Sequence, residues 1–174
     1  VVAPAQGLAR VPEGMDNAEA SAFLIAYATA IHALKDRAAV QPGESVLILG
    51  AAGGVGMACV EVAKALGAKV IAAASTDEKL AACTAMGADA TINYTTEDLK
   101  KQAKRLSGGA VDVVCDIVGG PYSEPALRAT GWRGRFLVIG FAAGDIPKIP
   151  LNVPLLKGCS IMGVFWGSYI AREP

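Results

Sequence analysis

The sequence has few aromatic residues and no excess of either charge, and both features narrow its class. Phe, Trp and Tyr make up 6% of the 174 residues, whereas hydrophobic residues in total reach 53%. An aliphatic, glycine-rich composition is typical of parallel strands covered by helices rather than of an aromatic sandwich. Lys plus Arg number 16, as do Asp plus Glu. We therefore expect no nucleic-acid partner and no charge-driven attachment to a membrane.

Clustered metal ligands and long apolar runs are absent as well. His32 is the one histidine, and the four cysteines are scattered, with no C-x-x-C pair. Because zinc sites need clustered thiolate and imidazole ligands, we expect no metal site and small thiols in a reducing compartment. No apolar run reaches the roughly 18 residues of a membrane span, and no stretch has the pattern of a signal peptide. We therefore expect a soluble, cytoplasmic protein.

What the sequence does contain is a regular alternation of short apolar runs and helix-like segments from residue 46 onward. Runs that are apolar throughout are typical of strands buried on both faces of a parallel sheet. We expect a Rossmann-type α/β fold, a doubly wound six-stranded parallel sheet with helices on both faces. The expected strands cover residues 46–49, 70–73, 90–93, part of 111–118, 136–140 and 159–164, and the expected helices cover 55–66, 77–86, 97–106 and 123–129.

A long helix is expected before this alternation, over residues 18–38. Asp16 or Asn17 can cap its start. The segment is apolar on most faces, which predicts a helix that is buried on more than one side.

A glycine-rich loop joins the first expected strand to the next helix. Residues 50–56 read Gly-Ala-Ala-Gly-Gly-Val-Gly. Gly53 lets the backbone approach a pyrophosphate, Gly56 lets the helix pack closely on the strand, and the free N–H groups at the helix start face the anion. Ala51 stands where the usual G-x-G-x-x-G pattern has its first glycine. Since strand, loop and helix follow in the right order, we expect a dinucleotide site.

The end of the second strand predicts which dinucleotide binds. NAD sites usually carry an acid there for the ribose hydroxyls, whereas this strand ends in two alanines followed by Ser75 and Thr76. These small residues leave room for a 2′-phosphate, and Lys79 can meet it as a point charge. Asp77 and Glu78 argue against this, although acids also suit a first helical turn. NADPH is the expected cofactor, with a solvated surface lysine as the alternative for Lys79.

Further motifs occur in a fixed order along nearly the whole chain. They are residues 26–34 (AYATAIHAL), 43–48 (GESVLI), 51–56 (AAGGVG), 75–79 (STDEK), 87–89 (GAD), 92–94 (INY), 112–116 (DVVCD), 118–120 (VGG), 134–135 (GR) and 138–141 (VIGF). With them the sequence resembles the medium-chain dehydrogenase/reductase superfamily, and within it the zinc-independent NADPH:quinone oxidoreductase (ζ-crystallin-like) branch.

The resemblance implies a role for each matching position. The pyrophosphate would lie on Ala52, Gly53, Gly54, Val55 and Gly56, the 2′-phosphate on Ser75, Thr76 and Lys79, the adenosine end against Tyr94, and the nicotinamide towards Thr29, Gly140 and Phe141. Two alternatives stay open: Tyr94 as a cover for the edge of the third strand, and Phe141 as a core residue. His32 is expected to be a packed structural residue rather than a proton donor.

Two departures from the family pattern affect what the resemblance implies. Zinc-dependent relatives place a cysteine ligand shortly before the position of Tyr27, where this chain has AFLIA at residues 22–26, with Ser21 nearest. This departure fits the zinc-independent branch. Relatives also carry a separate catalytic domain, mostly before this region. We therefore expect residues 1–16 to be the end of a mostly absent catalytic domain and a linker, and residues 17–174 to be the NADP(H)-binding Rossmann domain with its preceding long helix.

The implied function is that of the cofactor-binding domain of an NADPH-dependent oxidoreductase, which reduces quinones or α,β-unsaturated carbonyls by hydride transfer. No catalytic residue is assigned, and the isolated chain is expected to be inactive. The alternatives are an enoyl-thioester reductase domain of a larger assembly and a non-catalytic NADPH-binding scaffold or sensor. Relatives dimerise near the last strand, so a homodimer through the apolar run from Ser160 to Trp166 is expected, unless the catalytic domain covers this edge.

Overall fold

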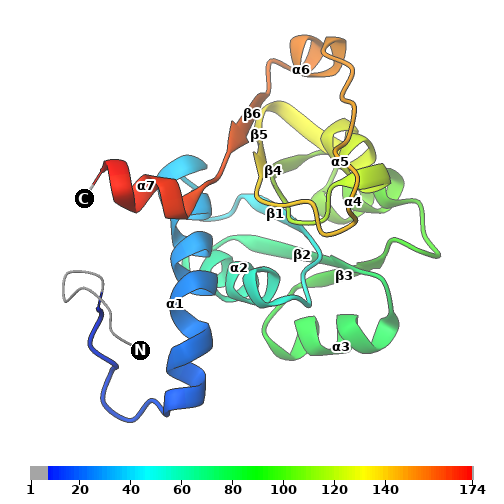
Figure 1. The fold of residues 1–174 in the computed structure, drawn as a ribbon. Helices are drawn as coiled ribbons and strands as arrows, with labels where there is room; N and C mark the ends of the chain where they lie inside the picture. The colour runs from blue at the N-terminus through cyan, green and yellow to red at the C-terminus, as the bar shows by residue number, and fades with distance from the viewer. Residues whose placement is uncertain (1–7, 174) are drawn as a thin grey trace.

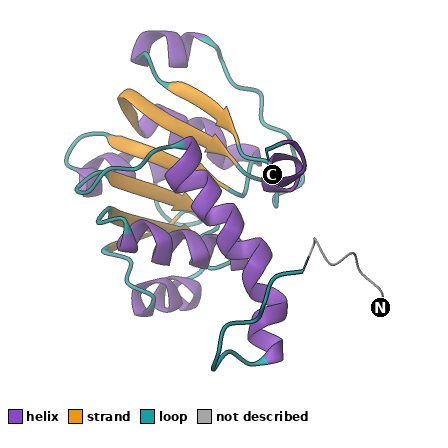
Figure 2. Ribbon diagram, turned by 90° about the vertical axis from the view of Figure 1, so that its left-hand side faces the viewer, coloured by secondary structure: helices purple, strands orange, loops and turns teal. Residues whose placement is uncertain are grey.

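The computed structural model describes residues 8–173, so the first part of the segment expected to be the end of a catalytic domain and a linker, residues 1–16, lies outside the described residues. Its centre is one sheet of six parallel strands in the order β3-β2-β1-β4-β5-β6. Helices cover both faces of the sheet (Figures 1 and 2). The expected Rossmann-type doubly wound fold is thereby confirmed. In such a sheet, ligands bind in the crevice outside the carboxyl ends of the strands where the strand order reverses, which here lies between β1 and β4.

The strands are short and apolar, as a sheet covered on both faces requires. All five residues of β1 are buried, and its side chains alternate between two core clusters. Val46 and Ile48 belong to one cluster, and Leu47 and Leu49 to the other, because successive side chains of a strand point to opposite faces. The strands are β1 (Ser45–Leu49), β2 (Lys69–Ala74), β3 (Ala90–Asn93), β4 (Val111–Asp116), β5 (Thr130–Val138) and β6 (Ser160–Gly163).

The four helices expected at residues 55–66, 77–86, 97–106 and 123–129 begin and end close to these positions. The helices of the described residues are α1 (Asn17–Ile31), α2 (Gly54–Ala65), α3 (Asp77–Ala85), α4 (Leu99–Ser107), α5 (Ser123–Ala129), α6 (Asn152–Lys157) and α7 (Trp166–Arg172), with a π-helical turn η2 (His32–Arg37) and a 3-10 turn η3 (Gly120–Tyr122). The sequence patterns did not predict α6 or α7. Among the helices of residues 8–173, none combines the length and the apolarity of a bilayer-spanning segment.

The prediction that the long helix over residues 18–38 is buried on more than one side holds only for its last part, where Ala30, His32, Ala33, Leu34 and Ala38 are buried. Within α1 only Ala30 is buried, and Phe23, Leu24 and Ile25 are 39%, 44% and 66% exposed. The helix packs on α2 along one side, and residues 8–12 lie beside Phe23 and Leu24, with which they line a hollow. Apolar side chains on a helix show what it can bury, whereas the neighbours that bury them are supplied by tertiary structure.

The fifth strand begins earlier than expected, at Thr130 instead of residue 136, and ends at Val138. Its first half is hard to read from sequence because Trp132 and Arg133 are exposed and Arg133 has a positive φ of 59°. The pairing with β4 shifts register there, between Val111 and Val113. An irregular strand of this kind lacks the apolar run that identifies the other strands.

Candidate functional site

The glycine-rich segment at residues 50–56 depends on glycine at two positions and leaves two others open. Gly50 has a φ of +69°, and a Cβ there would lie 2.8 Å from Val118 Cγ2. A Cβ at Gly56 would lie 2.3 Å from the carbonyl oxygen of Gly50 and 2.7 Å from backbone atoms of Ala51. A Cβ at Gly53 would lie 3.4 Å from the same oxygen, and at Gly54 it would meet nothing within 4 Å. Gly53 has a φ of −82°, which any residue adopts. The fold therefore requires glycine at positions 50 and 56, whereas Gly53 and Gly54 leave exposed backbone that a ligand can approach.

The start of α2 differs from the starts of three other helices. The side chains of Asp16, Thr76 and Asp98 cap α1, α3 and α4, accepting hydrogen bonds from backbone N–H groups over 2.8, 3.3 and 2.9 Å. At α2 the N-cap is Gly53, and no side chain caps the helix. The first N–H groups of a helix have no intrahelical partners and sit at the positive end of its dipole. The start of α2 therefore fits a bound anion, such as a pyrophosphate.

Beside this glycine-rich loop is a small hollow of about 130 Å³, called the loop hollow below. The end of β2, helix α3 and the residue after β3 meet the loop there. It is lined by Gly50, Ala52, Gly53, Ala74, Lys79 and Tyr94. The ammonium of Lys79 donates a hydrogen bond to Ser75 Oγ over 3.1 Å, so Ser75 belongs to the same group. The structure thus brings Ala52, Gly53, Ser75, Lys79 and Tyr94 together.

Asp77, the acid two residues before Lys79, has a neutral hydrogen-bond partner. Asn93, at the end of β3, donates a hydrogen bond from Nδ2 to Asp77 Oδ1 over 2.8 Å. This contact ties the Asp77 carboxylate to the next strand, and sequence reasoning did not assign it. Thr76 acts as the cap of α3. Burial raises the pKa of Tyr94, and so does the neighbouring Tyr122, while a hydrogen bond with Ser75 lowers it.

The other expected positions lie outside the hollow. Gly54 lines a separate hollow between α1 and α2, and the half-buried Val55 packs against the core. Thr29 is half-buried on α1. Gly140 donates from its N–H to the carbonyl of Asp116 over 3.2 Å. Phe141 is 42% exposed and is not a core residue.

Sequence reasoning did not assign a role to the side chain of Asp116. It is 3% exposed and lies at the carboxyl end of β4, where the strand order reverses. Its Oδ1 accepts from the N–H groups of Val118 and Gly119 over 3.0 and 2.8 Å, and its Oδ2 accepts from Ser123 Oγ over 2.5 Å. The carboxylate therefore fixes the turn after β4. An acidic residue at the end of an apolar strand could have indicated this role from the sequence, because a carboxylate is almost never buried without hydrogen-bond partners.

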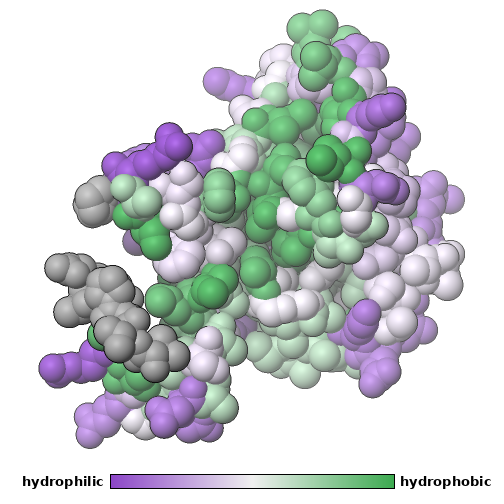
Figure 3. Space-filling model, viewed as in Figure 1, coloured by the Kyte–Doolittle hydropathy of each residue, from purple (hydrophilic) through white to green (hydrophobic). Residues whose placement is uncertain are grey.

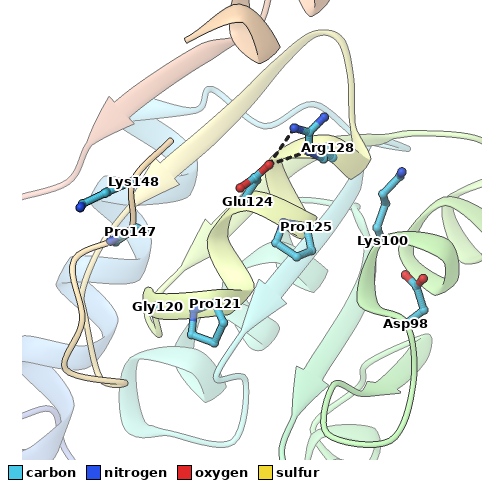
Figure 4. A pocket seen from close by; sticks show the side chains of 9 residues that line it. All are labelled: Asp98, Lys100, Gly120, Pro121, Glu124, Pro125, Arg128, Pro147 and Lys148. Carbon is cyan, nitrogen blue, oxygen red and sulfur yellow. Dashed lines mark hydrogen bonds and ion pairs between the residues drawn. The ribbon is translucent and has the colours of Figure 1, made fainter. Parts of the chain in front are cut away.

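A larger hollow of about 400 Å³ lies apart from the loop, between the starts of α4 and α5 (Figure 4). Lys100, Arg128 and Lys148 are among its lining residues, and Arg128 forms an ion pair with Glu124 over 2.7 Å. It shares no lining residue with the loop hollow. The surface cations are therefore no part of the candidate site.

The remaining chemically active side chains of the described residues are dispersed. Nowhere in residues 8–173 do three or more His, Cys, Asp or Glu side chains gather as metal ligands would. His32 is 6% exposed, bonds through Nδ1 to Asp36 over 3.1 Å and stacks on Tyr169 at a ring distance of 4.2 Å. His32 is thus a packed residue.

Comparison with known proteins agrees with this geometry. The family described as zinc-binding dehydrogenase matches residues 54–174. The chain is 46% identical over 166 residues to quinone oxidoreductase-like protein 2 of Bos taurus, covering 94% of this chain and 48% of that protein. It is 39% identical over 143 residues to the pikromycin polyketide synthase component PikAII of Streptomyces venezuelae, covering 80% of this chain and 4% of that protein.

Among solved structures, the quinone oxidoreductase of Thermus thermophilus, also determined in complex with NADPH, superposes with a TM-score of 0.86 at 37% identity, covering 98% of this chain and 54% of that one. The chain spans about half the length of the quinone oxidoreductase-like relative and of this solved structure. It therefore belongs to the zinc-binding dehydrogenase family, in the quinone oxidoreductase-like part of the medium-chain dehydrogenase/reductase superfamily, and corresponds to its nucleotide-binding portion.

Proposed function

We propose that the chain is the NADPH-binding domain of a zinc-independent oxidoreductase that reduces quinones or α,β-unsaturated carbonyls. The observation that carries the proposal is the start of α2, which no side chain caps. Glycine is present there at positions 53 and 54, although the packing of the fold does not require it. NADPH supplies the hydride, and the chain binds and orients the cofactor. The NADPH complex of the Thermus thermophilus relative supports the choice of cofactor.

We assign residues of this chain to each part of NADPH as part of the proposal. The uncapped start of α2 would hold the pyrophosphate. Lys79 and Ser75, with no acid at the end of β2, would hold the 2′-phosphate. Thr29, Gly140 and Phe141 are proposed to lie towards the nicotinamide. No proton donor is assigned in this chain, and the contacts to the acceptor are proposed to come largely from outside it.

Replacing Lys79 with alanine should remove most of the preference for NADPH over NADH. A charge-assisted contact to the 2′-phosphate is worth about 1.5–3 kcal/mol, so NADPH affinity should fall roughly tenfold to a hundredfold while NADH affinity stays the same. Calorimetric titration of the purified chain with both cofactors measures this. Lys35→Ala, at an exposed lysine on η2, is the matched control and should leave both affinities unchanged. Equal affinity of the wild-type chain for both cofactors would refute the proposal for Lys79.

A second candidate function is an enoyl-thioester reductase domain of a larger assembly. The identity with a polyketide synthase component, which spans 4% of that protein, favours it. Both candidates use the same cofactor site and differ in the acceptor. Reduction of a quinone against reduction of an enoyl thioester by the full-length protein separates them.

We also propose that the protein is a homodimer through β6. This strand is at the edge of the sheet, and Ile161 and Phe165 are 41% and 76% exposed. Beside it, α6 carries Leu155 and Leu156, which are 79% and 74% exposed, and apolar surface covers the top of the molecule at α6 (Figure 3). Exposed apolar edges are usually paired or covered in stable proteins.

Sedimentation velocity at micromolar concentration should give the mass of a dimer for the wild-type chain. Ile161→Lys places a charge on the edge strand, a device that prevents edge pairing, and should give a monomer. Lys35→Ala should stay dimeric. A monomeric wild-type chain would contradict the proposal.

A further inference from the structure

Two tyrosines from different loops meet at the adenosine side of the candidate site. Tyr94 follows β3, and Tyr122 ends η3 after β4. Their ring centroids are 4.2 Å apart, with the ring planes tilted by 42°. Tyr94 lines the loop hollow and Tyr122 does not. The ring of Tyr94 therefore contacts Tyr122 and also lines the hollow.

Tyr94 lies beside the group that would hold the 2′-phosphate. Ser75 Oγ accepts from Lys79 Nζ over 3.1 Å, and Lys79 and Tyr94 line the same hollow. Thr95, the next residue after Tyr94, donates from its hydroxyl to the backbone carbonyl of Ser75 over 3.1 Å. The Thr95 contact fixes the backbone beside Tyr94, and the position of the Tyr94 ring plane is left to the packing of its faces.

Tyr122 is held firmly enough to fix that plane. It lies on the turn that the Asp116 carboxylate holds through two backbone N–H groups and Ser123 Oγ. Ser123, which directly follows Tyr122, is fully buried. Gly119 and Gly120 in this turn have positive φ values of 70° and 58°, which glycine adopts without strain.

We propose that Tyr122 is a positioning residue for cofactor binding: it holds the ring of Tyr94 so that the opposite face of that ring packs against the adenine. This inference rests on the proposed NADPH function. Aromatic side chains stack on bases of every kind through their faces. A ring held by a second aromatic partner loses less freedom when the base binds.

The test uses 2′,5′-ADP, which carries the adenine and the 2′-phosphate but no nicotinamide, titrated into the purified chain. Tyr122→Leu keeps apolar bulk and removes the ring, and it should weaken 2′,5′-ADP about tenfold, the effect of one lost aromatic contact. Tyr122→Phe keeps the ring and should bind within about twofold of the wild-type chain. Such a rescue by phenylalanine would not be expected if the hydroxyl of Tyr122 were the contact.

A double-mutant cycle tests whether Tyr122 acts through Tyr94. In a Tyr94→Leu background, adding Tyr122→Leu should change the affinity for 2′,5′-ADP by no more than about twofold. If the double mutant lost affinity by the product of the two single-mutant factors, Tyr122 would contact adenine itself, and the proposal would be overturned. Unchanged affinity of Tyr122→Leu alone would overturn it as well. Failure of the wild-type chain to bind NADPH or 2′,5′-ADP at all would instead reject the proposed function, and this inference with it.

Discussion

Gly56→Ala is expected to be among the most destabilising single substitutions in this chain. The added methyl group would lie 2.3 Å from the Gly50 carbonyl oxygen and 2.7 Å from two backbone atoms of Ala51. Backbone atoms cannot rotate away as a side chain can, so the start of α2 has to move off β1. Overpacking in a well-packed region typically costs about 1–3 kcal/mol and occasionally more, and we expect at least the upper end here. Urea unfolding followed by circular dichroism measures the loss.

Gly53→Ala is the matched control, because it adds the same methyl group to the same loop. Its Cβ would make an ordinary contact at 3.4 Å, so the free energy of unfolding should fall by no more than about 1 kcal/mol, the range of N-cap effects. The affinity for NADPH should nevertheless fall, since the methyl group is added at the N-cap of α2, where the pyrophosphate is proposed to bind. If Gly56→Ala were as stable as Gly53→Ala, close helix–strand packing would not be the reason for glycine at position 56.

Asp116→Ala should produce the second large effect. The substitution removes the acceptor of two backbone N–H groups and of the Ser123 hydroxyl, in a place where the side chain is 3% exposed. Each buried donor that loses its partner costs about 1–3 kcal/mol. We therefore expect a loss of about 3–5 kcal/mol and weaker NADPH binding, because the turn that carries Gly119 and Tyr122 loses its anchor.

Two further variants separate the anchoring role of Asp116 from a general loss of stability. Asp116→Asn keeps the shape and one acceptor oxygen for the two N–H groups, so it should be intermediate in stability. Asp112, near the amino end of β4, accepts from the N–H and hydroxyl of Ser45 over 2.8 Å each. Asp112→Ala should lower stability and leave NADPH affinity unchanged. Equal loss of NADPH affinity in Asp112→Ala and Asp116→Ala would contradict a local role for Asp116.

The sequence by itself determined the fold class and the place of the phosphate loop. Both depend on local signals: wholly apolar runs such as residues 46–49, and a glycine cluster between a strand and a helix. A run that is apolar on both faces has one stable position, inside a sheet that is covered on both sides. The place of Ser75 and Lys79 at the end of the second strand was also predicted from the residues, whereas that of Tyr94 came from the family resemblance.

Only the tertiary structure decided which side chains hold this edge together. The contacts of Asp77 with Asn93 and of Tyr94 with Tyr122 join different strands and loops, and no local pattern encodes them. The same holds for the exposed side of α1 and for the irregular start of β5 at Thr130. Burial and register depend on what packs against a segment, which its own residues do not specify.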